Sequence, residues 1–106
     1  MNPDIETQLN AWTLGQRELA VPIQISLIPP EIKKEWLHFV RPKDCFNNAQ
    51  VVSSLFGCDY VEGFYVISNT LVAEHAWNCK NGIHFDVTTS IGEAYYQVVK
   101  IDVNHI

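Results

Sequence analysis

Apolar residues recur at helical spacing in the first half of the chain. Residues 1–20 contain apolar side chains at roughly helical spacing. Residues 31–40 place apolar side chains on one face of a short helix. The strongest signal covers residues 44–57, where Asp44, a good N-cap, precedes the apolar positions and Gly57 follows them. One apolar stripe of this helix consists of Cys45, Ala49, Val52 and Phe56.

After Gly57 the pattern changes to the two-residue period of β-strands. Helices followed by strands in hairpin order predict an α+β fold, in which the helix over 44–57 packs on an antiparallel sheet of about four strands. The N-terminal third is expected to cover an edge of this sheet. The predicted strands are Tyr60–Ile67, Leu71–Asn78, Ile83–Thr88 and Tyr95–Val103, with turns at Asn69-Thr70, Asn81-Gly82 and Ile91-Gly92.

The composition predicts one globular domain spanning residues 1–106. Hydrophobic residues make up 47% and charged residues 18%, which excludes wholesale disorder. A net charge of −5 argues against nucleic acid or an anionic membrane as the main partner. No apolar run approaches the ~18 residues of a membrane span, and the first residues do not resemble a secretory signal. Three cysteines cannot all pair, which favours a reducing, cytoplasmic compartment.

Cys45 lies at the predicted start of the helix over 44–57. Unpaired N–H groups carry partial positive charge there, which stabilises a thiolate and lowers the pKa of a cysteine. A thiolate nucleophile also needs a proton carrier for the leaving group, usually a histidine held by a carboxylate. Cys45 is therefore the candidate nucleophile, whereas Cys58 and Cys79 are expected to be packing residues.

The predicted turn at Asn81-Gly82 supplies a candidate histidine and carboxylate. An Asn-Gly pair favours a two-residue turn, which places His75 and Asp86 on one face as diagonal neighbours within hydrogen-bonding reach. A three-residue turn would put them on opposite faces. The nucleophile completes the set only if its helix packs on the face that bears His75. Trp77, expected to shield the pair from water, and His84, a reserve base, share that face.

Three motifs follow one another within about residues 44–90: Cys45-Phe46-Asn47-Asn48-Ala49, His75-Ala76-Trp77-Asn78 and Gly82-Ile83-His84-Phe85-Asp86-Val87-Thr88. In this order they resemble the transglutaminase-like branch of the papain-fold cysteine hydrolases. The resemblance implies a papain/transglutaminase-like core and attack on an amide, ester or isopeptide carbonyl through an acyl-enzyme. It assigns Cys45 as nucleophile, His75 as general base and acid, and Asp86 as the group that orients His75.

We therefore expect a small cysteine hydrolase or acyltransferase, such as a peptidase or deamidase, that acts on a protein or peptide without a cofactor. The alternative is a non-catalytic binding module, an inhibitor or adaptor that keeps the same fold, because an acidic chain of this length has little substrate-binding surface. Candidate substrate-binding residues are Trp77, Glu62 and Gln24. Gln24 precedes the cysteine, as the oxyanion glutamine does in papain-like enzymes. The sequence carries no signal for an oligomeric state.

A zinc site is the second chemical hypothesis, since Cys45, Cys58, His75 and Cys79 are all suitable ligand types. Cys45 and Cys58 flank a helix of about twelve residues, which is ~18 Å long. Both sulfurs cannot bind one ion at the ~2.3 Å that zinc requires. We therefore expect no metal site, and the sequence contains no glycine-rich phosphate loop or basic aromatic stripe for nucleic acid.

Overall fold

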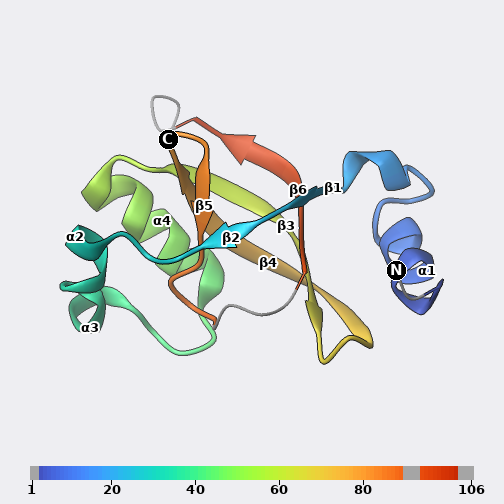
Figure 1. Cartoon of the computed structure of the whole chain (residues 1–106), viewed down its shortest axis with the longest axis horizontal. Coiled ribbons are helices and arrows are strands. Elements are labelled where there is room, and N and C mark those ends of the chain that lie inside the picture. The colour runs from blue at the N-terminus through green and yellow to red at the C-terminus, as the bar shows by residue number, and fades with distance from the viewer. Residues whose placement is uncertain (1–2, 90–93, 103–106) are drawn as a thin grey trace.

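The computed structural model describes residues 3–89 and 94–102 and has a mixed α+β architecture (Figure 1). The predicted turn at Ile91-Gly92 and the predicted strand end at Val103 lie outside these residues. The helices are α1 (Pro3–Trp12), α2 (Pro30–Lys33), α3 (Trp36–Phe39) and α4 (Cys45–Phe56), with a 3₁₀ turn η1 (Arg17–Leu19). The strands are β1 (Val21–Ile23), β2 (Ile25–Ser26), β3 (Asp59–Ile67), β4 (Leu71–Lys80), β5 (Ile83–Phe85) and β6 (Tyr95–Ile101).

All six of these strands belong to one curled sheet, in the order β1-β6-β3-β4-β5-β2. β1 and β2 are separated only by Gln24, yet they pair with opposite edges of the sheet. The sheet therefore curls until both edges reach residues 21–26, and β2 crosses in front of it in Figure 1. The prediction of about four strands is wrong, because residues 21–26 add two short ones. The pairing is also not wholly antiparallel, since β2 runs parallel to β5.

The curled sheet encloses one group of buried side chains and carries others on its outer face. α1 covers one end of the outer face through Ile5 and Leu9. α2, α3 and α4 lie at the other end (Figure 1), where Ile32 and Val52 join a second cluster. The sheet is thus covered at both ends by helices that bury an apolar stripe. The enclosed group contains Val61, Trp77, Cys79 and Tyr95.

The helix predicted over 44–57 is confirmed as α4. Gly57 follows it with a left-handed φ of 67°, and its N–H donates to the carbonyl of Ser53 at 3.1 Å. Asp44 occupies the N-cap position, but its side chain makes no cap hydrogen bond. Neither α4 nor any other helix in the described part of the chain has the length and apolar character needed to cross a membrane.

The predicted hairpin between β4 and β5 is also confirmed. Asn81 and Gly82 have φ values of 53° and 80°, as a two-residue turn of type I′ requires. Cys79 lies opposite His84 across the turn, which is the register expected from the sequence. The candidate site depends on this register, since a shift by one residue would turn one strand's side chains to the other face.

The helix predicted over 31–40 is interrupted. α2 ends at Lys33 and α3 begins at Trp36, because Glu35 adopts φ −99° and ψ 2°, outside the helical region. The break accompanies a long-range contact, in which the Trp36 indole N–H donates to the carbonyl of Val87 at 2.7 Å. Helical spacing in the sequence thus yields two single turns that pack on the segment after β5.

β5 ends at Phe85, three residues before the predicted end at Thr88. The reason is the side chain of Asp86, whose Oδ1 accepts a hydrogen bond from the backbone N–H of Thr88 at 2.9 Å. A short polar side chain that binds the backbone two residues on forms an Asx turn, which replaces strand pairing.

Gly63 lies beside a bulge in β6, where the pairing of β6 with β3 shifts, and a Cβ atom at Gly63 would collide with the carbonyl oxygen of Tyr96. We expect Gly63→Ala to lower the free energy of unfolding by about 3 kcal/mol or more, since a strand carbonyl has little room to move. Gly82→Ala is the control, because Gly82 has open space around it and a φ of 80°. Its loss should be only about 1 kcal/mol. Equilibrium unfolding in urea measures both, and equal losses would contradict the steric explanation.

Candidate active site

Cys45 is the first residue of α4, and it is 8% exposed. α4 packs on the outer face of β4, where Ala49 contacts Ala76 and accepts a hydrogen bond from Asn78 Nδ2 at 2.9 Å. Side chains alternate along a strand, so His75 points to the opposite, inner face. The packing required by the sequence argument, with the helix on the face that bears His75, is therefore not the one observed. The thiol reaches the imidazole past the edge of β4.

The early end of β5 leaves this edge of β4 open to the thiol. Asn78 pairs with Phe85, the last residue of β5. In a hairpin closed by a two-residue turn, the N–H groups of Asn78 and Ala76 both point toward the partner strand. Ala76 lies beyond the last pair, and its backbone forms a hydrogen bond with the sulfur of Cys45 instead. The thiol thus occupies the position of a missing strand partner.

His75 lies between the thiol and a carboxylate. Its Nε2 is 2.7 Å from Oδ2 of Asp86, and the ring shares another hydrogen bond with Cys45. Because Asp86 occupies Nε2, Nδ1 is the nitrogen that faces the thiol. His75 and Asp86 are only 4% and 3% exposed. The structure therefore brings together the three residues that the sequence proposed for catalysis.

Four contacts fix the Asp86 carboxylate. Oδ1 accepts the backbone N–H groups of Thr88 at 2.9 Å and Thr89 at 3.4 Å. Oδ2 accepts the Tyr95 hydroxyl at 2.6 Å in addition to facing His75. A buried carboxylate needs such donors. Tyr95 was not predicted as a site residue, since a strand tyrosine is ordinarily core.

Aromatic rings surround the imidazole. The Tyr65 ring lies 4.4 Å from the His75 ring between centroids, with an interplanar angle of 37°. Trp77 lies further along the inner face, at 6.3 Å from His75. Trp77 is fully buried, and its indole N–H donates to His84 Nδ1 at 3.0 Å. It offers no surface to a substrate, so the structure places this predicted substrate-binding residue in the core.

Burial, hydrogen bonding and charge set the protonation of the pair. Burial raises the pKa of the Cys45 thiol, but the hydrogen bond and charge of His75, helped by the backbone of Ala76, outweigh it and hold the pKa below 9.0. Burial lowers the pKa of His75, but hydrogen bonds to Asp86 and Cys45 raise it to about 9. Both shifts favour a thiolate and an imidazolium near neutral pH.

A cleft of about 410 Å³ opens beside the pair, and both Cys45 and His75 line it. Lys43, an exposed residue with a left-handed φ of 63°, lies at the same cleft. A second pocket of about 170 Å³ shares His75 and is lined by Glu62, one of the three predicted substrate-binding residues. The Glu62 carboxylate accepts a hydrogen bond from the hydroxyl of Tyr60.

Gln24 and His84 lie elsewhere. Gln24 is exposed between β1 and β2 and is not among the residues that line the cleft at Cys45. This position does not support a role for Gln24 in substrate or oxyanion binding. His84, the reserve base, accepts the Trp77 N–H on the inner face, and burial lowers its pKa.

Asn48 is a positioning residue that the sequence patterns missed. Its Oδ1 accepts the backbone N–H of Arg41 at 2.9 Å, and its Nδ2 donates to the Arg41 carbonyl at 2.8 Å. Nδ2 also donates to Thr88 Oγ1 at 3.0 Å, so Asn48 ties the loop before α4 to the segment after Asp86. The signal available in the sequence was a polar residue about one turn after Cys45 and directly before Ala49 of the apolar stripe. Its complete burial is seen only in the structure.

The remaining cysteines are packing residues, as predicted. Cys58 and Cys79 are each 1% exposed, and burial raises the pKa of both thiols. Within residues 3–89 and 94–102, no three histidine, cysteine, aspartate or glutamate side chains are grouped so that they could hold a metal ion.

Comparison of the chain with protein-family models, with curated proteins and with solved structures found no match. The similarity to transglutaminase-like enzymes therefore rests on the three sequence motifs.

Asp86→Asn removes the negative charge that holds the His75 proton. Since burial alone lowers the pKa of His75, we expect that pKa to fall from about 9 toward or below 6.5 in the variant. Titration of the imidazole ring protons by NMR measures it. Tyr95→Phe is the matched control, because it removes one hydrogen bond from the carboxylate but leaves its charge, and the pKa should stay raised. An unchanged pKa in Asp86→Asn would show that the carboxylate does not hold the proton.

Proposed function

We propose that this chain is a small thiol hydrolase or acyltransferase with a papain/transglutaminase-like core, acting on an amide or isopeptide bond of a peptide or protein. The thiol of Cys45, at a helix N-terminus, is hydrogen-bonded to His75, whose Nε2 is 2.7 Å from the buried carboxylate of Asp86. Such a set combines a nucleophile, a proton carrier and the group that orients the carrier.

The first chemical step is attack of the Cys45 thiolate on the carbonyl carbon, which moves an electron pair of the C=O bond onto the oxygen. When the C–N bond breaks, the proton on His75 Nδ1 passes to the departing nitrogen, and a thioester to Cys45 remains. Nδ1 faces the thiol, so it lies on the side where the leaving group departs. Asp86 keeps the imidazole in this orientation through Nε2.

The start of α4 supplies donors for the negative charge that develops on the oxygen. The first N–H groups of a helix have no acceptor within the helix, and the Asp44 side chain makes no cap hydrogen bond to them. The N–H of Cys45 can therefore donate a hydrogen bond to the substrate oxygen that becomes negatively charged when the Cys45 sulfur attacks. The hydrogen bond from the backbone of Ala76 goes to the sulfur and stabilises the thiolate.

The second step resolves the thioester. Neutral His75 accepts a proton from water, the resulting hydroxide attacks the carbonyl carbon, and the thiolate leaves. Peptidase, deamidase and acyl-transfer outcomes share this sequence and differ in which amine departs and which nucleophile resolves the thioester. No step draws on a cofactor. Each step needs Cys45 as a free thiol, and all three cysteines are free in the structure. This requirement supports a reducing, cytoplasmic location.

Selective alkylation tests whether Cys45 is activated. Because its pKa is lowered while those of Cys58 and Cys79 are raised, iodoacetamide should modify Cys45 well below pH 8 and faster than the other two by about tenfold or more. The rate should rise with pH as the thiol ionises. Mass spectrometry of the cysteine-containing peptides measures the three rates.

The control for this experiment tests whether the fast reaction of Cys45 is caused by His75 or only by solvent access to the sulfur. His75→Ala should remove the low-pH reaction of Cys45, whereas His38→Ala should leave it unchanged, because His38 is a surface residue. Equally slow modification of all three cysteines would overturn the activated pair and favour the alternative, a binding module without turnover.

Acyl-enzyme formation tests turnover directly. With p-nitrophenyl acetate, we expect a burst of about one p-nitrophenolate per chain, followed by slower steady release, because attack and resolution are separate steps. The acetyl group should be found on Cys45 by mass spectrometry. Cys45→Ala should abolish the burst, and His75→Ala should reduce the steady rate by about a hundredfold or more. A steady rate unaffected by either change would exclude the proposed mechanism.

A further inference from the structure

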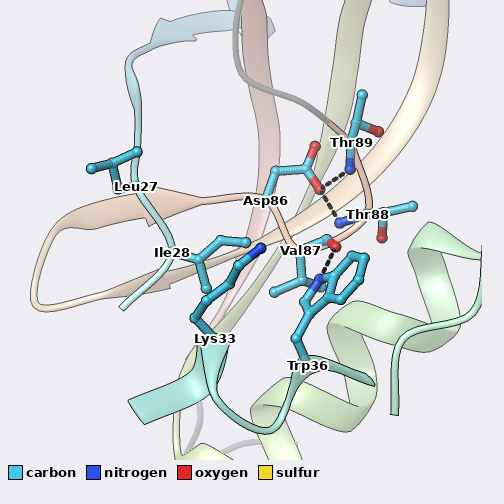
Figure 2. A pocket seen from close by; sticks show the side chains of 8 residues that line it. All are labelled: Leu27, Ile28, Lys33, Trp36, Asp86, Val87, Thr88 and Thr89. Atoms are coloured by element: carbon cyan, nitrogen blue, oxygen red, sulfur yellow. Dashed lines mark hydrogen bonds between the residues drawn. The ribbon is translucent and has the colours of Figure 1, made fainter. Parts of the chain in front are cut away.

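A larger pocket lies on the other side of the segment that follows β5. Its volume is about 660 Å³, and Figure 2 shows it between α2, α3 and residues 86–89. It shares Thr88 and Thr89 with the cleft at Cys45, so the two hollows meet along this short stretch of backbone. The pocket is lined by Leu27, Ile28, Lys33, Trp36, Asp86, Val87, Thr88 and Thr89.

The walls of this pocket are mainly apolar and are held in place before anything binds. Trp36 presents its ring to the pocket, and its indole N–H is fixed by the carbonyl of Val87 at 2.7 Å. In Figure 2 Val87 lies beside the ring, and Ile28 lies on the other side of the Lys33 side chain. Val87 belongs to the buried cluster that contains Ile32, and Ile28 and Trp36 pack against this cluster. Concave, apolar and pre-formed surfaces of this kind are typical of sites for small groups.

Lys33 gives the pocket one unpaired positive charge. Its Nζ lies 4.7 Å from the centroid of the Trp36 ring, and no ion pair of Lys33 occurs among the described residues. Asp86 also lines the pocket, but its carboxylate turns toward Thr88 and Thr89 (Figure 2) and is fully engaged by its hydrogen bonds. An anion that entered the pocket would therefore meet an ammonium group without meeting a free carboxylate.

We propose that this pocket is a substrate subsite, which receives an apolar group ending in a carboxylate from the molecule whose carbonyl is presented to Cys45. The inference rests on the proposed function and adds the class of substrate. The apolar part packs on Trp36, Ile28 and Val87, and the carboxylate binds the ammonium of Lys33. The connecting chain crosses Thr88 and Thr89, which line both hollows.

Alkylation of Cys45 by tailed probes tests this subsite. A series of chloroacetamido alkanoic acids of increasing chain length is compared with N-alkyl chloroacetamides of matched length. At one length the carboxylate probe should react faster than its neutral partner by about threefold to fivefold, the size expected of a partly exposed ion pair. Lys33→Gln should abolish this preference. Lys34→Gln, which removes an exposed charge on the next residue but not from the pocket, should retain it.

A binding measurement decides the question even if Cys45 proves inert. In Cys45→Ser, titration with hexanoate should shift the NMR signal of the Trp36 indole N–H, identified by its loss in Trp36→Phe, and Lys33→Gln should weaken the binding. Rapid reaction of iodoacetamide with no carboxylate preference at any length, or no shift of the Trp36 signal, would overturn the subsite while leaving the thiol chemistry standing. Slow reaction with every probe, together with a clear shift, would overturn the thiol chemistry and retain an anion-binding pocket.

Discussion

The buried carboxylate of Asp86 connects the end of the sheet to the chemistry of the site. Its Oδ1 binds the backbone N–H of Thr88 at 2.9 Å and thereby ends β5, while its Oδ2 faces His75 at 2.7 Å. A buried carboxylate without such partners would strongly destabilise the fold. The hydrogen bonds that turn the chain after Phe85 therefore also fix the carboxylate that orients the imidazole.

The early end of β5 has a second consequence, at the edge of β4. The backbone of Ala76 has no strand partner there and binds the sulfur of Cys45. α4 can then pack on the outer face of the strand while its first residue contacts His75, which belongs to the inner face. The pair is thus assembled across a strand edge, where a cleft gives access to the sulfur.

The curled sheet gives this arrangement its rigidity. Residues 21–26 pair with both edges, and the side chain of Asn48 joins the loop before α4 to Thr88. The segment 86–89 is consequently held from several sides and separates two hollows, the cleft at Cys45 and the pocket at Trp36. Reactive groups supported by packed elements on every side keep their geometry better than groups carried on free loops.

The features that depend on local backbone conformation could be predicted from the sequence. The period of α4, the left-handed Gly57 and the two-residue turn at Asn81-Gly82 are local properties, and that turn fixes the register that aligns His75 with Asp86. Other features could not be predicted: the packing of α4 on the outer face, the interruption of the helix over 31–40, the closing strands at 21–26, and the positions of Trp77 and Gln24. Each of these features depends on contacts between residues far apart in the chain, such as the hydrogen bond from Trp36 to Val87. Local sequence patterns carry no information about the energies of such contacts.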